Sequence, residues 1–249
     1  MPERSPAPAP PPGPGADSSP PPLPPGLYLV GTPIGNLEDI TLRALRVLRS
    51  ATRILAEDTR HTRRLLDRHG IATPMISCHK FNERSRIDDI LRRIRSGEAL
   101  ALVTDAGMPG ISDPGARAAD AVRAAALPAT VVPGPSALTA AVALCGHVEN
   151  SSFLFEGFLD HKTAARRRRL NELADFPSPV VFYESTHRIG KLLNEVEEEL
   201  GPERRIFIAR ELTKKFEEAF SGTAPELRAR FQTRSSKGEF VVILLPAAT

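Results

Sequence analysis

The stretch T-D-A-G-M-P-G-I-S-D-P-G, residues 104–115, decides the fold class of this chain. It directly follows an apolar run at 100–103 that predicts a buried strand. The stretch holds three glycines, two prolines and two carboxylates, and this composition predicts a fixed, open loop. Open α/β sheets bind ligands at loops that follow the carboxyl ends of their strands. We therefore predict an α/β fold with a ligand at this loop.

Two more loops of this kind follow predicted strands. G-T-P-I-G-N at 31–36 comes after an apolar run, and P-G-P-S-A at 133–137 comes after another. The first lacks both the G-x-G-x-x-G spacing of a dinucleotide fold and the lysine of a phosphate-binding loop. By itself it also fits any tight strand-to-helix turn. In the second, Ser136 either caps the next helix or binds the ligand.

The two carboxylates of 104–115 have different predicted roles. Asp105 lies at the strand end, where it can contact a cationic or hydroxyl-bearing ligand. Asp113 precedes Pro114, and an aspartate followed by proline is typical of a helix start. We expect Asp113 to cap a helix and Asp105 to face the ligand.

Short apolar runs alternate with amphipathic stretches along the chain, which is the pattern of βαβ units. In the first part Asp39 or Thr41 caps a helix, and Gly70 and Gly97 end two others. The predicted strands there are 27–30, 54–56, 100–103 and 130–132, with later helices from 114 and over 135–145. The second part has predicted strands at 153–155, 180–183, 205–209, 216–220 and 240–245, and helices at about 163–175, 187–200 and 224–232.

We predict two α/β domains, 27–147 with a parallel sheet and 148–249 with a mixed sheet. The mixed sheet follows from the connection at 210–215, which is too short for a helical crossover and predicts an antiparallel pair. Before them, residues 1–26 hold 12 of the 24 prolines and few apolar side chains, so we expect a disordered leader. It is either a proline-rich ligand for a partner or an unstructured extension.

Composition limits the class of protein. No run of 18 apolar residues occurs and the leader lacks the apolar core of a signal peptide, so we expect a cytoplasmic protein without a membrane span. Cys78 and Cys145 are not spaced as metal ligands and are expected to be buried; no metal is predicted. The net charge of +3 is mild, but arginines cluster on the predicted helices. They either contact nucleic acid or reflect an arginine-rich composition on solvated faces.

Further motifs extend along most of the chain beyond Gly26. They are V-G-T-P-I-G-N-L-x-D-I-T (30–41), A-E-D-T-R (56–60), F-x-G-F (155–158), F-Y-E-S (182–185), R-E-L-T-K (210–214) and K-G-E-F (237–240). With the loops above, the sequence resembles the tetrapyrrole-methylase superfamily of S-adenosylmethionine-dependent methyltransferases (class III). It is most similar to the branch that methylates the ribose 2′-hydroxyl of a cytidine in 16S ribosomal RNA of the small subunit.

The resemblance implies S-adenosylmethionine in a cleft between two domains, and a homodimer. The residues implied for cofactor binding are Thr32, Pro33, Asp105, Ala106, Gly107, Met108, Ile111, Ser136, Ala137, Phe182 and Tyr183. The candidates for deprotonating or polarising the hydroxyl are Glu57, Lys214, Lys237 and Glu239. A lysine could act as the base with a lowered pKa or stay charged and stabilise the alkoxide.

For RNA we hypothesise phosphate contacts from an arginine group. Its members are Arg60, Arg63, Arg64, Arg166, Arg167, Arg168 and Arg169. With 11 phenylalanines, 2 tyrosines and no tryptophan, we expect little base stacking. Two alternatives stay open: a methylase of the same superfamily that acts on a tetrapyrrole or another small molecule, and a non-catalytic ribosome-assembly factor that binds RNA.

Overall fold

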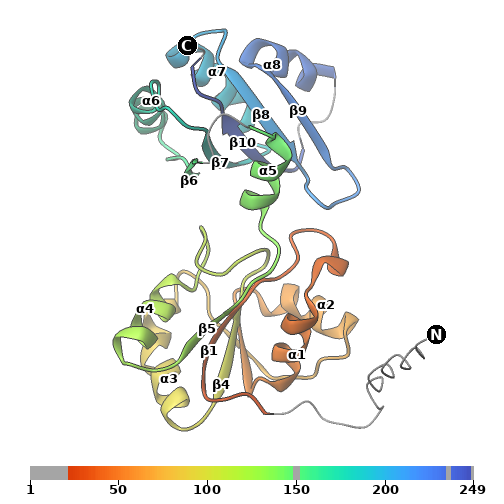
Figure 1. Ribbon diagram of the computed structural model, residues 1–249, viewed down its shortest axis with the longest axis vertical. Coiled ribbons are helices and arrows are strands. Elements are labelled where there is room, and N and C mark those ends of the chain that lie inside the picture. The colour runs from red at the N-terminus through yellow and green to blue at the C-terminus, as the bar shows by residue number, and fades with distance from the viewer. Residues whose placement is uncertain (1–21, 148–151, 234–236, 248–249) are drawn as a thin grey trace, which may run out of the picture.

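The computed structural model describes residues 22–147, 152–233 and 237–247 of the chain. These residues form two lobes, one above the other in Figure 1, and the polypeptide passes from the lower to the upper lobe at α5 (Ala137–Cys145). Each lobe is built around its own five-stranded sheet. The predicted two-sheet α/β class is confirmed.

The first sheet is parallel throughout and has the strand order β3-β2-β4-β1-β5. Its strands are β1 (Gly26–Val30), β2 (Arg53–Ala56), β3 (Met75–Ser77), β4 (Ala99–Val103) and β5 (Ala129–Val132). All five residues of β4 are buried, as expected for a central strand that is covered on both faces.

Helices cover both faces of this sheet. On one face lie α1 (Leu42–Ser50) and α2 (Thr59–Arg68), and on the other lie α3 (Glu83–Arg95) and α4 (Ala116–Ala124). Successive side chains of a strand point to opposite faces. Leu102 accordingly packs with α3 and α4, while Val103 packs with α1 and α2.

The predicted helix ends follow from local chemistry. Of the two candidates for the cap of α1, it is the Thr41 hydroxyl that accepts a hydrogen bond from the Ala44 N–H, at 3.0 Å. Asp39 instead lies in a short 3-10 turn, η1 (Leu37–Asp39). Gly70 and Gly97 follow α2 and α3 with φ of 60° and 94°, in the left-handed region that glycine tolerates.

The second sheet is mixed and has the order β6-β7-β10-β8-β9. Its strands are β6 (Leu154–Phe158), β7 (Val180–Ser185), β8 (Arg205–Arg210), β9 (Glu218–Thr223) and β10 (Glu239–Leu244). β6 and β7 are parallel, and the other three pairings are antiparallel. The antiparallel pair that we predicted across 210–215 is the β8–β9 pair.

The helices of the upper lobe divide between the two faces of this sheet. One face carries α6 (Thr163–Glu172), α7 (Ile189–Leu200) and α8 (Ala224–Thr233). The other face is covered by α5, whose Ala141 packs with Val181, Phe207 and Val241. We expected α5 to complete the first unit, but its apolar side packs on the second sheet. The boundary at 147/148 stays a prediction, and residues 148–151 lie outside the described residues.

Other expectations were incomplete. We did not predict β3, because this three-residue edge strand is only partly buried and is too short to show an apolar run. Cys78 is buried, but Cys145 is only partly buried, so that expectation was half wrong. The predicted disordered leader falls largely on residues 1–21, which lie outside the described residues. Strand β1 already begins at Gly26. No helix in the described part has both the length and the apolarity to cross a membrane.

Candidate active site

The glycine-rich loops of the lower lobe meet where its strands end. The N–H of Thr32 donates to the carbonyl of Gly107 at 2.9 Å, and the N–H of Gly107 donates back at 3.1 Å. A Cβ built on Gly31 would lie 2.8 Å from the backbone of Gly134, so neither loop has room for a side chain there. The three loops therefore hold one another in place.

A cavity of about 390 Å³ lies beside these loops and receives residues from both lobes. This volume falls within the range of ligand pockets, roughly 300–1,000 Å³. Eight of the predicted cofactor residues line it: Asp105, Ala106, Gly107, Met108, Ile111, Ser136, Ala137 and Tyr183. Three of the four predicted catalytic candidates also line it: Glu57, Lys214 and Glu239.

Three predicted cofactor residues do not line the cavity. Thr32 is 3% exposed, and its hydroxyl donates to the Thr104 carbonyl at 3.1 Å, so it stabilises the loop at 104–115 without facing the cavity. Pro33, the next residue, is also buried. Phe182 is 1% exposed in the core of the upper lobe. Neighbouring side chains of a strand face opposite ways, so of the pair only Tyr183 reaches the cavity.

Three carboxylates gather on the lower-lobe side of the cavity: Glu57, Asp105 and Asp113. The N–H of Asp105 donates to Glu57 at 3.4 Å, and the N–H of Asp58 donates to Asp105 at 3.2 Å. Burial raises the pKa of Glu57 above its ordinary value. Desolvation raises the pKa of Asp113 to about 6, and the negative charges of Glu57 and Asp105 add to this shift. These groups favour a cationic or proton-donating ligand.

The prediction that Asp113 caps a helix was wrong. The cap residue of α4 is Gly115, with φ of 126°, and no side chain of the loop caps it. The buried carboxylate of Glu83 reaches across from the first turn of α3 instead, and accepts from the N–H groups of Gly115 at 3.0 Å and Ala118 at 3.1 Å. Because the cap comes from another helix, Asp113 is free to face the cavity.

The upper lobe contributes a lysine held by two glutamates. The ammonium of Lys214 lies 2.6 Å from Glu239 and 3.0 Å from Glu211. Burial lowers the pKa of Lys214, but the bonds to the two carboxylates outweigh it and raise the pKa above its ordinary value. Of the two roles left open for a lysine, this environment favours the permanently charged one.

The loop of Lys214 is also joined to the lower lobe. The N–H of Asn36 donates to the Thr213 hydroxyl at 3.1 Å, and a Cβ on Gly35 would overlap the Lys214 side chain. Lys237, the fourth catalytic candidate, is exposed and does not line the cavity. Its carbonyl instead accepts a hydrogen bond from the guanidinium of Arg210 at 2.7 Å, which steadies the K-G-E-F segment.

Aromatic rings form part of the upper wall. Tyr183 contacts Phe155 and Phe158 edge to face, with ring centres 5.0 and 5.5 Å apart. A bulge in β6 at Gly157, where φ is 66°, brings Phe158 to the cavity. Phe158 was not among the predicted site residues, although the F-x-G-F motif that contains it was a signal that could have identified it.

The arginines predicted to contact RNA fall into two groups. Arg60, Arg63 and Arg64 are exposed on α2. This helix begins two residues after the cavity residue Glu57. Only Arg63 approaches a carboxylate on its own helix, Asp67 at 3.9 Å. This group is available to a phosphate backbone.

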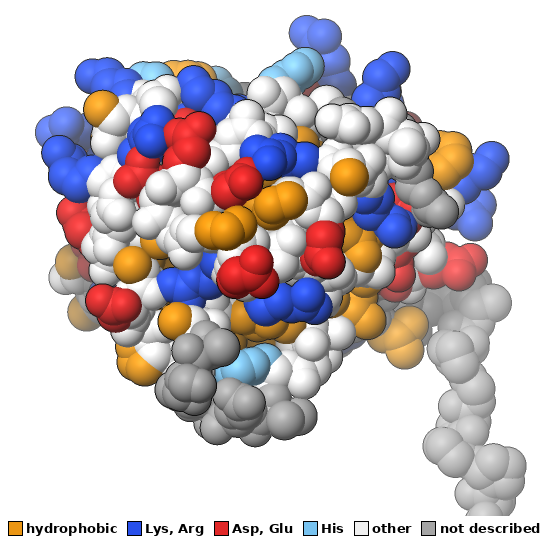
Figure 2. All heavy atoms as spheres, turned by 90° about the horizontal axis from the view of Figure 1, so that it is seen from above, with side chains coloured by type: hydrophobic (Ala, Val, Ile, Leu, Met, Phe, Trp, Pro, Cys, Tyr) orange, Lys and Arg blue, Asp and Glu red, His pale blue; other side chains and the backbone are white. Residues whose placement is uncertain are grey.

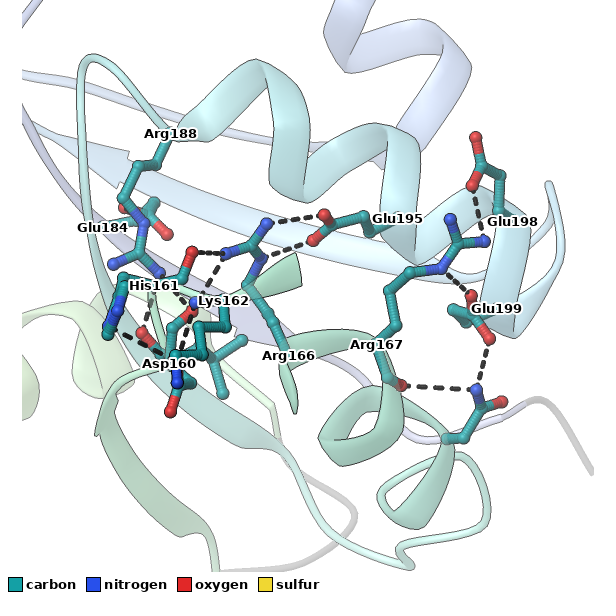
Figure 3. A network of polar contacts seen from close by, with 12 residues as sticks. Asp160, His161, Lys162, Arg166, Arg167, Glu184, Arg188, Glu195, Glu198 and Glu199 are labelled. Atoms are coloured by element: carbon teal, nitrogen blue, oxygen red, sulfur yellow. Dashed lines mark hydrogen bonds and ion pairs between the residues drawn. The ribbon is translucent and has the colours of Figure 1, made fainter. Parts of the chain in front are cut away.

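The run from Arg166 to Arg169 is largely occupied within the protein, as Figure 3 shows for its first two members. Arg166 is 2% exposed. It forms a bidentate ion pair with Glu195 and donates to the Asp160 carbonyl at 2.9 Å. Arg167 pairs with Glu198 and Glu199, and Arg169 with Glu156 and Glu172. A phosphate role for Arg166 is wrong, because its guanidinium is buried. Arg168, 76% exposed, is the most accessible of the four.

The surface charge of the upper lobe fits this pairing. On the face in Figure 2, which views the molecule from the end of that lobe, basic and acidic side chains are interspersed.

Among the described residues no group of three or more histidine, cysteine or carboxylate side chains could hold a metal ion.

The fold and the cavity between two sheets define a known class. The family model of the Tetrapyrrole (Corrin/Porphyrin) Methylases matches residues 26–228, and the chain belongs to this family. Among solved structures, the methyltransferase CobJ aligns with a TM-score of 0.65 at 21% identity, covering 90% of this chain and 95% of that one. A uroporphyrin-III C-methyl transferase from Thermus thermophilus, complexed with S-adenyl homocysteine, gives 0.62 at 20% identity, covering 88% and 96%. At such identities the likeness shows the fold.

Closer relatives share one name. A protein of Xylella fastidiosa (strain Temecula1), named Ribosomal RNA small subunit methyltransferase I, is 48% identical over 227 residues, which cover 90% of this chain and 83% of that protein. A protein of Thermotoga maritima with the same name is 45% identical over 218 residues, which cover 88% and 97%.

Proposed function

We propose that this chain transfers a methyl group from S-adenosylmethionine to the ribose 2′-hydroxyl of a cytidine in 16S ribosomal RNA. One observation carries the proposal: Glu57, Lys214 and Glu239, which lie in the motifs of the ribosomal RNA branch, line the same cavity as the cofactor loops. The names of the relatives at 42–48% identity support the substrate class.

The cavity suits the cofactor chemically. S-adenosylmethionine carries a cationic sulfonium and ammonium, two ribose hydroxyls and a flat adenine. Carboxylates such as Asp105 match the cationic and hydroxyl groups, and the apolar side chains of Ile34, Met108 and Leu212 match the adenine. The loop from Asp105 to Met108, with Ser136 and Ala137, would hold this molecule.

Bound there, the cofactor supplies a methyl group on a good leaving group, so the protein mainly has to orient the acceptor oxygen and manage its proton. Asp113 lines the cavity, and burial raises its pKa to about 6, which suits a group that accepts the hydroxyl proton. Lys214 stays charged and lines the cavity, where it would stabilise the negative charge that develops on that oxygen. Glu239 and Glu211 fix its ammonium.

The exposed arginines of α2 would bind the RNA backbone next to the cavity. Replacing Arg60 and Arg64 by alanine should weaken RNA binding about equally for all sequences and lower the salt dependence by roughly one phosphate contact each. Arg123→Ala is a matched control, since that side chain is 80% exposed on α4 at the opposite face of the sheet. An unchanged salt slope in the double variant would remove this role.

The rival functions predict different outcomes. A tetrapyrrole methylase would methylate a porphyrinogen and ignore small ribosomal subunits, and a non-catalytic assembly factor would bind S-adenosylmethionine without turnover on any RNA. Ribose methylation in small-subunit RNA should be mapped by mass spectrometry from cells with and without this protein. The loss of one cytidine 2′-O-methyl group is expected, and an identical map would refute the proposal.

Three further expectations accompany this function. The substrate is the 16S RNA or the small subunit that contains it, so the protein acts in the cytoplasm. It forms a homodimer, which sedimentation equilibrium can test. Its division into domains at 147/148 can be tested by limited proteolysis, which should cut first near that position.

A further inference from the structure

Three exposed phenylalanines belong to the cavity wall or to segments that adjoin it. Phe81, Phe158 and Phe216 are 85%, 57% and 63% exposed. A single exposed apolar side chain needs no explanation. These three, however, come from separate parts of the sequence and are all linked to the same site.

Phe81 belongs to the loop after β3. The N–H of Cys78 donates to the carbonyl of Ala56 at 2.8 Å, which places the start of this loop beside the cavity residue Glu57. Nearby positive charge at Lys80 and His79 lowers the pKa of the Glu57 carboxyl, in partial opposition to its burial. Phe81 therefore extends into solvent next to the lower wall of the cavity.

Phe216 belongs to the opposite lobe. It follows the cavity residue Lys214 by two positions, in a turn closed by the bond from the Glu217 N–H to the Lys214 carbonyl at 3.1 Å. Lys215 and Phe216 are the two central residues of this turn, and both are exposed. Phe158 lines the cavity itself.

Two of these rings form cation–π contacts with a neighbouring lysine. The ammonium of Lys80 lies 5.0 Å from the ring centre of Phe81, and that of Lys215 lies 5.6 Å from the ring centre of Phe216. Each pair therefore offers a flat apolar surface and a positive charge together. That combination fits one ligand chemistry well: an unpaired nucleotide, whose base stacks on the ring while its phosphate meets the ammonium.

We propose that Lys80–Phe81 and Lys215–Phe216, one pair on each lobe, bind unpaired nucleotides of the RNA strand on either side of the acceptor nucleotide. The inference rests on the proposed function and names how its substrate is held. Although aromatic residues are few in this chain, these two rings lie on segments that adjoin the cavity, one on each lobe, where stacking can contribute to recognition.

The test is steady-state methyl transfer to purified small ribosomal subunits that lack the modification. Loss of one stacked base corresponds to about 1–3 kcal/mol, so Phe81→Ala and Phe216→Ala should each raise the KM for subunits roughly 5- to 150-fold. The affinity for S-adenosylmethionine, measured by calorimetry, should stay unchanged, because neither ring lines the cavity. Phe153→Ala, at a 39% exposed ring outside the cavity, is the matched control and should leave KM unchanged.

Conservative variants separate stacking from mere apolar contact. Phe81→Tyr and Phe216→Tyr keep the flat ring and should restore KM, while leucine at either position should not. Lys80→Ala and Lys215→Ala should reduce the salt dependence of KM, which the phenylalanine variants should leave intact.

The outcomes that overturn the proposal are distinct. If the unmodified protein methylates subunits and the alanine variants keep its KM, the aromatic pairs do not bind RNA. If the variants dissociate a dimer without changing KM, these rings cover a second copy of the chain instead. If the unmodified protein does not methylate subunits at all, the proposed function fails, and this inference fails with it.

Discussion

Removing the guanidinium of Arg166 should destabilise the upper lobe strongly. Arg166 and Glu195 have side chains only 3% and 4% exposed, and they face each other through two hydrogen bonds (Figure 3). Arg166→Ala leaves a buried carboxylate without its partner, and leaves the Asp160 carbonyl with only the longer hydrogen bond from Arg188, at 3.3 Å. Breaking such a buried pair typically costs about 3–5 kcal/mol, a large part of the stability of a domain.

The assay is urea unfolding followed by circular dichroism, with free energies from linear extrapolation. Arg168→Ala is the matched control: that side chain is 76% exposed and 3.8 Å from Glu172, so its loss should change stability by less than about 0.5 kcal/mol. The double variant Arg166→Met with Glu195→Leu removes both charges and should recover most of the loss. If Arg166→Ala unfolds within about 1 kcal/mol of the unmodified protein, the reasoning is refuted.

The site allows three further predictions. Asp113→Asn should lower kcat by about 10²–10⁴-fold. It should also abolish the fall in activity below about pH 6, because the unmodified carboxyl becomes protonated there and cannot accept a proton. A pH–rate profile whose acid limb is unchanged in the variant would contradict this role. Lys214→Gln should lower the rate constant of single-turnover methyl transfer about 10²–10³-fold, while the affinity for S-adenosylmethionine changes little. A loss confined to that affinity would instead assign the lysine to cofactor binding. Gly134→Ala puts a Cβ 2.9 Å from the backbone of Gly31 and should weaken S-adenosylmethionine binding at least about tenfold by calorimetry, whereas Gly190→Ala, with open space around its Cβ, should not.

The sequence predicted what depends on local pattern. The apolar run at 100–103 predicted a buried strand and the loop after it predicted a ligand site, and residues of that loop line the cavity, because burial and backbone restriction are visible in consecutive residues. The left-handed glycines that end α2 and α3 were predicted for the same reason.

What the sequence could not predict depends on partners distant in the chain. Asp113 looked like a helix cap because the pattern around Pro114 is local, whereas the true cap, Glu83, comes from another helix. Four consecutive arginines looked like one basic patch, but a helix turns about 100° per residue, so they point in four directions. One of those directions meets Glu195 in the core.

The contact between Gly31 and Gly134 has a consequence for how this protein can change over time. When a large core residue grows, a neighbour can often shrink to make room. Here both members of the contact already lack a side chain, so no second-site replacement at either position can rescue a change at the other. Such rescue would have to come from backbone movement that also shifts the ligand-facing loops. Both positions are therefore expected to remain glycine, because a substitution at either one cannot be compensated at the other.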